Sequence, residues 1–295
     1  MAAAESHRQE RYWRSALRRA DAAAACGALI PLATELLAVD GTEPFVLRRL
    51  VSRTPKHLRS GGPKPNPFLP WEKELQVDRL GSDHVLLLNK YPVQPGHLLV
   101  ISAQWQPQSG WLQPSDWLAV AHVAADTGGL WFFNSCPAAG ASQPHRHLQL
   151  LPRSTGQESC PLATALAAQL RGDGPTWPWR YCLSRRLHAR GGLAGPDDAT
   201  ELNALYLAHA RSLGLGDPRE DARPRHPYNL LFDDDWVLTV RREREHCAGF
   251  SLNALGFAGY LLATLRSDLA WLSQHGPWRL LEAVAAPAEP PPPLH

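Results

Sequence analysis

The 295-residue chain lacks the features that mark membrane, secreted and nucleic-acid-binding proteins. Its longest apolar stretch, residues 20–39, is interrupted by Asp21, Pro31 and Glu35, and is too broken to span a bilayer. The first eight residues contain no apolar core of the signal-peptide type. The formal net charge is only +2, without the basic excess typical of nucleic-acid-binding proteins. We therefore expect a cytoplasmic protein whose partners include neither membrane nor nucleic acid.

Cysteine and lysine are also scarce. The five cysteines include no Cys-x-x-Cys pair, so their spacing indicates neither a disulfide framework nor a compact zinc site. Four lysines stand against 26 arginines. We attribute this skew to genome composition, but it draws attention to each lysine. Lys90 ends an otherwise apolar segment, where a point charge can hold a polyphosphate, although a lysine at the end of a strand is usually just solvated.

The hydrophobic pattern predicts several antiparallel strands. Apolar runs at 84–89 and 97–102 are separated by prolines and a glycine, which indicates two adjacent strands. Three aspartates between 228–232 and 236–240 predict a hairpin. Further strands are expected at 129–134, 145–151 and 179–183.

Helical patterns occur between these strands, and two segments have no regular pattern. Helices are expected at 5–25, 115–125, 161–171, 198–213 and 253–271. Residues 42–70 read as an irregular, proline-rich and basic loop, and the tail at 287–295 as disordered. The sequence therefore predicts an α+β fold, in which an antiparallel sheet is packed by a few helices.

The segment that carries chemistry is residues 134–149, Asn-Ser-Cys-Pro-Ala-Ala-Gly-Ala-Ser-Gln-Pro-His-Arg-His-Leu-Gln. Alternate side chains of a strand share a face, so His145, His147 and Gln149 are expected to point together. Two imidazoles and a carboxamide are not groups that fill an apolar core. The preceding turn, residues 140–142, can aim successive backbone N–H groups and a serine hydroxyl at one anion. A phosphate site beside paired histidines indicates phosphoryl or nucleotidyl transfer.

His147 is the nucleophile that this arrangement favours, because the conjugate acid of an imidazole titrates near pH 7. Its attack on an α-phosphate gives a phosphoramidate and splits one displacement into two in-line steps. His145 is expected to orient or polarise His147, or to bind the phosphate chain. Gln149 can donate to a phosphoryl oxygen or hold the imidazole tautomer, but it cannot act as a general acid. The leaving group must therefore be a good one, such as a polyphosphate.

Other interpretations of the two histidines stay open. A His-x-His pair on a strand is more often a pair of metal ligands or an incidental polar face than a nucleophile. Zinc requires a third and a fourth ligand, but Cys136 and Cys160 lack diagnostic spacing and Gln149 is a poor zinc ligand. No carboxylate cluster marks a cation site in the sequence. We therefore predict no protein metal site and no covalently bound cofactor.

Residues 134–149 closely resemble the signature of the diadenosine tetraphosphate phosphorylases, also called ATP adenylyltransferases. These form a branch of the histidine-triad superfamily in which glutamine replaces the third histidine, as in galactose-1-phosphate uridylyltransferases. Blocks at 66–70, 88–100, 228–230 and 253–259 resemble the same family in the same order. The resemblance implies a histidine-triad-like sheet. It also implies a single catalytic unit over residues 1–280, with an N-terminal part at about 1–170 and a C-terminal part at about 171–280.

The resemblance implies phosphorolysis: diadenosine tetraphosphate and phosphate give ATP and ADP through a covalent AMP on His147. A divalent cation such as Mg²⁺ is expected to accompany the polyphosphate. The implied nucleotide contacts are Asn89, Lys90, Asn134, Gly140, Ala141, Ser142, Gln143 and Gln149. Weaker candidates for the polyphosphate tail are Asn229, Arg241 and Arg242, for which hairpin and surface roles stay open, and Lys56, which matches a family lysine only loosely.

The chain departs from the family pattern in the signature itself. Cys136 stands where the family usually has glycine, and Arg146 replaces the common lysine between the histidines. Two functions remain as alternatives: a hexose-1-phosphate nucleotidyltransferase that uses the same His-x-His-x-Gln strand, and a dinucleoside polyphosphate sensor without turnover. The strands carry no interpretable signal of oligomerisation.

Overall fold

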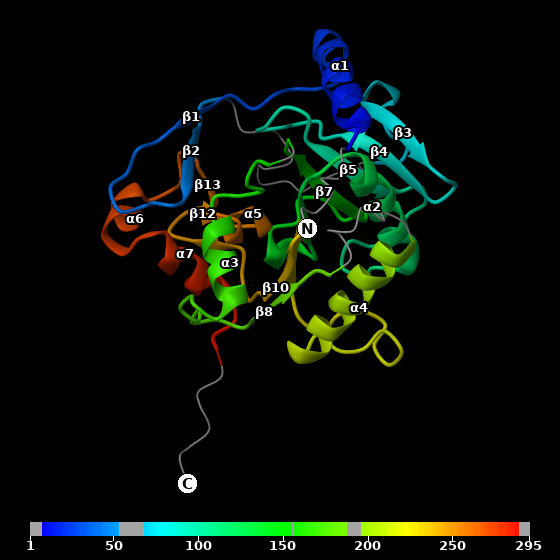
Figure 1. Ribbon diagram of the computed structural model, residues 1–295. Helices are drawn as coiled ribbons and strands as arrows, with labels where there is room; N and C mark the ends of the chain where they lie inside the picture. The colour runs from blue at the N-terminus through cyan, green and yellow to red at the C-terminus, as the bar shows by residue number, and fades with distance from the viewer. Residues whose placement is uncertain (1–7, 53–65, 67, 155, 188–195, 289–295) are drawn as a thin grey trace.

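An eight-stranded antiparallel sheet forms the centre of the computed structural model, which describes residues 8–52, 66, 68–154, 156–187 and 196–288 (Figure 1). The strand order is β3-β4-β5-β7-β6-β9-β10-β8. The strands are β3 (Gln76–Leu80), β4 (His84–Leu88), β5 (Leu98–Ser102), β6 (Gly129–Asn134), β7 (His147–Pro152), β8 (Tyr181–Arg185), β9 (Tyr228–Phe232) and β10 (Trp236–Arg241). The predicted α+β class is confirmed.

Two smaller sheets accompany the large one. β1 (Thr34–Leu36) pairs with β2 (Val46–Leu50), and β2 also pairs in parallel with β13 (Tyr260–Ala263). β11 (His246–Cys247) and β12 (Phe250–Ser251) form a short antiparallel pair. The parallel pairing of β2 with β13 joins segments that are about 210 residues apart in the chain, so local sequence carries little information about it.

Helices cover both faces of the large sheet (Figure 1). One face of the sheet, which we call the back face, is covered by α1 (Arg11–Ala25), α2 (Pro114–Asp126) and α4 (Pro196–Ser212), whose apolar residues share one core with the sheet. The opposite face is the front face. On the front face lie α3 (Ala163–Arg171), α5 (Ala254–Phe257), α6 (Leu269–His275) and α7 (Pro277–Val284), which share a second core. The 3₁₀ turns η2 (Lys73–Leu75) and η3 (Pro137–Ala139) connect the strands. Within the described ranges, no helix has the length and apolar character needed to cross a bilayer.

The alternation of side chains along β7 places the polar residues on the front face. Leu148 and Leu150 belong to the back core. His147 and Gln149 point the other way, because β5 pairs Ile101 with His147 and Leu99 with Gln149, and directly paired residues share a face. Leu99 and Ile101 form a small apolar cluster with Val85 and Leu87. The front face therefore has apolar side chains on both sides of a polar centre.

Most of the predicted strands are confirmed. The runs at 84–89 and 97–102 pair as β4 and β5, and the hairpin at 228–240 forms β9 and β10. The segment at 129–134 is β6, and that at 179–183 is shifted by two residues to β8.

The predicted helices at 115–125, 161–171 and 198–213 are present as α2, α3 and α4, with ends that differ by one or two residues. In the predicted helix at 5–25, α1 begins at Arg11, after Glu10 with φ of 51°. Residues 1–7 lie outside the described part of the chain.

The predicted helix at 253–271 is wrong. The structure has a single turn, α5, then β13, and a separate α6. Gly259 ends α5 with φ of +97°, and a Cβ there would lie 2.9 Å from Cβ of Pro161. The Gly259 carbonyl accepts from the backbone N–H of Val46 at 2.8 Å, so the chain continues as a strand beside β2. An apolar segment of this length does not by itself distinguish a helix from a buried strand.

Two irregular segments also differ from expectation. Residues 46–50, within the expected loop at 42–70, form β2, because pairing with β1 and β13 outweighs the local charge. At the other end, Pro287 pairs with Trp179, and the Ala288 N–H donates to the Pro178 carbonyl at 3.2 Å. The tail prediction is therefore wrong for these two residues, and 289–295 lie outside the described residues.

Candidate active site

The imidazole of His147 is buried at the first position of β7, with only 3% of the residue exposed. Its Nδ1 lies 2.8 Å from the backbone carbonyl of His145. A carbonyl can only accept, so Nδ1 carries the proton and Nε2 keeps its lone pair. Burial lowers the pKa of His147 to about 4, further than the sequence suggests, so the ring is neutral across the physiological pH range. The ring therefore has an unprotonated Nε2, which is the form that the predicted nucleophile requires.

The side chain of His145 lies beside His147 but outside the ladder of β7. The residue forms an isolated bridge with Pro107, so the predicted strand 145–151 begins two residues late. Its Nε2 lies 2.8 Å from the Ser102 carbonyl, and its Nδ1 lies 3.0 Å from the side-chain amide of Asn66. Both ring nitrogens of His145 are thus held by other groups, which favours an orienting role. Its carbonyl is the group that fixes the tautomer of His147.

Gln149 is oriented by a chain of hydrogen bonds that starts at Asn89. The Asn89 amide lies 3.1 Å from Nδ1 of His97, and Nε2 of His97 lies 3.0 Å from Oε1 of Gln149. Burial lowers the pKa of His97 to about 4, so its neutral ring accepts at Nδ1 and donates at Nε2. The carboxamide oxygen of Gln149 is therefore engaged, and its NH₂ group is the end that can donate to a phosphoryl oxygen.

The turn before β7 supplies fewer backbone donors than its sequence suggests. The N–H of Gly140 donates to Pro137 and that of Ala141 to Cys136, at 2.8 and 3.0 Å, so both N–H groups of the expected cradle are used within the turn. Ser142 is exposed, and the buried Oε1 of Gln143 has no partner among the described residues. Anion binding by this turn stays a prediction, and Ser142 and Gln143 are the residues left to provide it.

Gly140 has a conformational reason to be glycine. Its φ is +84°, and a Cβ there would lie 2.6 Å from Cβ of Asn253. The turn is therefore pressed against the residue that caps α5, whose Asn253 side chain accepts from the Leu255 N–H. This contact fixes the turn relative to the C-terminal half of the chain.

Asn134, Asn229 and Arg242 form a buried network behind the turn. Oδ1 of Asn134 accepts from Nδ2 of Asn229 at 2.8 Å and from the Ala254 N–H at 2.9 Å. Nδ2 of Asn229 also donates to the Ala139 carbonyl at 2.8 Å. Arg242 is 1% exposed and donates to Oδ1 of Asn229. These polar groups hold the turn in place through hydrogen bonds. Direct contacts of these residues with a polyphosphate stay predictions.

The other predicted contacts that the structure describes, Lys90 and Arg241, are partly buried and pair with other protein groups. Nζ of Lys90 forms an ion pair with Glu72 at 2.5 Å. The Arg241 guanidinium lies near the end of α4, with donations to the Leu213 carbonyl at 3.4 Å and to the His226 ring at 3.3 Å. Lys56 lies outside the described residues. The structure therefore brings together His147, His145, Gln149 and Asn89, with the turn nearby, but it does not bring Arg241 to them by any described contact.

Comparison with known proteins identifies the family. Residues 2–168 match the model of the Ap4A phosphorylase N-terminal domain, and residues 175–287 match the ATP adenylyltransferase C-terminal domain, where Ap4A is diadenosine tetraphosphate. The chain belongs to the Ap4A phosphorylase family. It is accordingly an enzyme of the ATP adenylyltransferase type.

Two curated relatives of this Ap4A phosphorylase family member come from Saccharomyces cerevisiae. Diadenosine 5',5'''-P1,P4-tetraphosphate phosphorylase 2 is 35% identical over 235 residues, which cover 71% of this chain and 72% of the relative. Protein APA1 is 35% identical over 245 residues, which cover 74% and 75%. The crystal structure of yeast Ap4A phosphorylase Apa2 in complex with Ap4A has a TM-score of 0.72 at 20% identity, and the match covers 96% of this chain and all of that one. This structural likeness supports the fold.

Several residues at the family site were not assigned a role from the sequence. Asn66 and Phe68 lie in the block at 66–70, and the Phe68 ring packs edge-on against His145 and His147 at 5.6 and 5.4 Å. His97 lies in the block at 88–100, but its bond to Gln149 depends on the pairing of β5 with β7. Gln108 bonds the backbone of His147 and belongs to no recognised block. Asn66, Phe68 and His97 lie in segments that resemble the family, so the sequence offered a way to find them. Nothing in the sequence pointed to Gln108.

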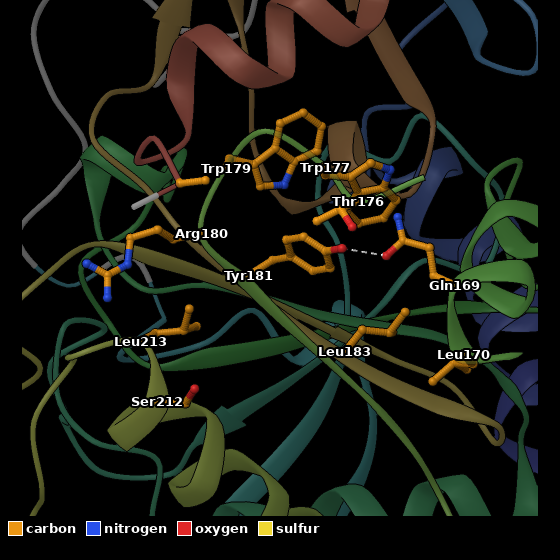
Figure 2. A pocket seen from close by; sticks show the side chains of 11 residues that line it. Gln169, Leu170, Thr176, Trp177, Trp179, Arg180, Tyr181, Leu183, Ser212 and Leu213 are labelled. Carbon is orange, nitrogen blue, oxygen red and sulfur yellow. Dashed lines mark hydrogen bonds between the residues drawn. The ribbon is translucent and has the colours of Figure 1, made fainter. Parts of the chain in front are cut away.

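Two surface cavities lie at the edges of the sheet rather than over the histidines. One of about 570 Å³ opens beside β8, where Trp177 stacks on Trp179 and the Tyr181 hydroxyl donates to Gln169 (Figure 2). The other, of about 650 Å³, opens beside β3 and is lined by Trp71 and Arg79, among others. Neither described lining contains a predicted site residue. The predicted site residues of this family member therefore lie outside the described linings of both cavities.

The described residues contain no group of three or more His, Cys, Asp or Glu side chains arranged to hold a metal ion. The described partners of His145 and His147 are carbonyls, the Ser102 hydroxyl, an amide and aromatic rings. The groups around the two histidines therefore orient neutral imidazole rings.

Proposed function

We propose that the chain catalyses phosphorolysis of diadenosine tetraphosphate to ATP and ADP, with the adenylyl group held in turn on Nε2 of His147. The membership of the family and the Ap4A phosphorolysis named for the yeast relative support the overall reaction. The observation that carries the covalent step is the bond from Nδ1 of His147 to the His145 carbonyl, because it leaves Nε2 as the free nucleophilic nitrogen.

In the first step, Nε2 of His147 attacks the α-phosphorus of diadenosine tetraphosphate. A P–N bond forms, the P–O bond to the remaining chain breaks, and ATP leaves with the electron pair. ATP is a good leaving group that needs no proton, which fits the absence of a carboxylic acid among the described partners of His145 and His147. The NH₂ group of Gln149 is placed to donate to the phosphoryl oxygens as charge moves onto them.

In the second step, an oxygen of inorganic phosphate attacks the adenylyl phosphorus, the P–N bond breaks and ADP forms. The two displacements at one phosphorus use the same histidine in turn, which predicts ping-pong kinetics. Because the His145 carbonyl keeps the proton on Nδ1, the adenylylated ring is an imidazolium, and it leaves the phosphorus as a neutral imidazole with the electron pair on Nε2. The low pKa of His147, about 4, favours this neutral leaving group. The substrate is expected to carry a divalent cation such as Mg²⁺.

The test is the fate of labelled phosphate. With diadenosine tetraphosphate, Mg²⁺ and [³²P]phosphate, we expect label in the β-phosphate of ADP and none in ATP. Without phosphate, we expect one equivalent of ATP to be released and an AMP adduct to accumulate, which mass spectrometry of peptides should locate on His147. Release of unlabelled nucleotides by water alone would contradict phosphorolysis. Transfer of the adenylyl group to a hexose 1-phosphate but not to phosphate would favour the sugar-phosphate enzymes.

A further inference from the structure

The pairing of β6 with β7 stops just before the catalytic histidine. The two strands are paired from Gly129 with Pro152 to Phe132 with Gln149. Continued in the same register, Asn134 would lie opposite His147, and the two backbones would bond each other directly. The chain instead begins the turn of residues 135–142 after Asn134. The strands therefore part beside the backbone of His147.

The carboxamide of Gln108 fills the place of the missing backbone bond. Its Oε1 accepts from the His147 N–H at 2.8 Å, and its Nε2 donates to the Asn134 carbonyl at 2.7 Å. A longer contact of 3.3 Å joins Nε2 to the His147 carbonyl. Gln108 is 2% exposed, so water does not supply these bonds. One side-chain amide thus satisfies a donor and an acceptor that the parting strands would otherwise leave unpaired.

Gln108 is itself held by backbone pairing. Its own N–H donates to the Pro144 carbonyl at 2.7 Å, and the Arg146 N–H donates to the Gln106 carbonyl at 2.8 Å. Between these bonds lies the isolated bridge of Pro107 with His145. Residues 106–108 therefore run as a short extra strand beside residues 144–146. The position of the Gln108 amide is set by the same segment that carries the His145 carbonyl.

We propose that Gln108 is a positioning residue for adenylyl transfer, because it holds β6 and β7 apart at His147 and so keeps open the space between the nucleophile and the turn. The inference rests on the proposed function. Gln108 acts through the backbones of His147 and Asn134, and its amide bonds leave no group directed at the substrate.

The first variant is Gln108→Met, which keeps the length of the side chain but removes both hydrogen bonds. The His147 N–H and the Asn134 carbonyl are then left to pair with each other, which closes the gap. We expect the rate of AMP-adduct formation at saturating diadenosine tetraphosphate to fall ~100-fold, with KM changed less than about 3-fold. Gln113→Met is the matched control, because Gln113 donates to the Trp111 carbonyl and touches neither β6 nor β7 by any described bond.

The second variant, Gln108→Glu, separates the effect of the side-chain hydrogen bonds from the effect of the side-chain volume. A neutral carboxylic acid reproduces both bonds, since its C=O accepts from the His147 N–H and its O–H donates to the Asn134 carbonyl, whereas a carboxylate cannot donate. Burial raises the pKa of such a group. We expect the adduct-formation rate of Q108E, relative to the unaltered protein at each pH, to rise as the pH falls from 8 to 6. The same ratio for Q108M should be flat.

The outcomes separate this inference from the proposed function. If the unaltered protein forms no adduct, the proposed function fails whatever Gln108 does. If the unaltered protein forms the adduct and both variants form it at the same rate, the positioning role is wrong. It is also wrong if the Q108E ratio does not change with pH, or if each variant loses activity only in proportion to its unfolded fraction. If Q108M fails to fold, the pH dependence of Q108E decides the question.

Discussion

The two faces of β7 use the same four-residue stretch of backbone for opposite purposes. Leu148 and Leu150 are fully buried in the back core, and each contributes apolar area without directional demands. His147 and Gln149 are nearly as buried, yet each polar atom that is engaged has a specific partner: a carbonyl for His147 and the His97 ring for Gln149. The difference teaches that burial on the front face sets protonation and orientation, whereas burial on the back face sets stability.

The largest expected effect is on the front face. His147→Asn removes the nucleophilic nitrogen, and we expect diadenosine tetraphosphate turnover to fall by a factor of at least about 1,000. No AMP adduct should form, while the unfolding temperature changes little. Steady-state assays and intact-mass spectrometry measure both quantities. His122→Asn is the control, because His122 is an exposed histidine bonded to Tyr12. Retained turnover in H147N would place the nucleophile elsewhere.

The matching change on the back face should reverse the pattern. Leu150→Ala removes a fully buried side chain, and we expect the free energy of unfolding to fall by about 2–5 kcal/mol. The activity per folded molecule should stay within about 2-fold of that of the unaltered protein, since the substitution leaves the front face intact. Denaturant titration measures the free energy of unfolding, and active-site counting with labelled AMP gives the activity per folded molecule. Leu118→Ala, at a residue that is 51% exposed, should leave stability almost unchanged. A loss of activity larger than the loss of folded protein in L150A would show that the two faces are not independent.

Acid should weaken the front face through its buried histidines. His97 and His147 have pKa values of about 4 in the folded chain, against about 6.5 when unfolded, because burial disfavours the imidazolium. The unfolded chain therefore binds more protons between these values. The stabilisation is complete above about pH 6.5 and is lost as the pH falls toward 4. We expect each histidine to account for about 2 kcal/mol of the stability lost between pH 7.5 and 5.

The acid effect can be checked by measuring the free energy of unfolding by urea at both pH values. His97→Asn should remove the share of the pH dependence that belongs to His97, while His122→Asn should not. An unchanged pH dependence in H97N would mean that His97 does not titrate in this window.

The smallest effect expected is on the orientation of Gln149. His97→Leu removes the donor that fixes Oε1 of Gln149, so the carboxamide is free to present either end to the phosphoryl group. We expect kcat to fall about 10-fold, which corresponds to ~1.4 kcal/mol at the transition state. The measurement is single-turnover adduct formation at saturating substrate. A fall confined to KM would instead assign His97 a role in binding.

Local pattern was sufficient for the parts of the fold that pair with near neighbours. β4 with β5 and β9 with β10 are each joined by a connection of a few residues, and apolar runs bounded by turn residues reveal them. The same alternation placed His147 and Gln149 on one face. β13 escaped detection because its partner β2 is remote in sequence and the pairing is parallel. Tertiary contact therefore decided between helix and strand for an apolar segment that either would suit.

The supporting residues of the site were less accessible to sequence reasoning. Gln108 reaches His147 across 39 residues and sits among residues with no catalytic character. Arg242 was a weaker candidate for a polyphosphate contact, and its donors reach the Asn229 side chain and the carbonyls of Val284, Arg244 and Leu252. An arginine with such partners cannot be distinguished from a ligand-binding one by residue type alone. The sequence predicted that His147 and Gln149 share a face, but not the hydrogen bonds that hold them.

The pairing of β6 with β9 joins the two parts of the chain that the family models match, and it bears on how the polypeptide can be divided into fragments. The regions matched by the two family models, 2–168 and 175–287, contribute neighbouring strands to the same sheet, with Trp131 paired to Phe232 and Asn134 to Asn229. Each half made alone would present an open, apolar strand edge, which is a template for aggregation. When the two halves are made together, their edges can pair. The enzyme is therefore suited to fragment complementation, in which recovered activity shows that β6 has paired with β9.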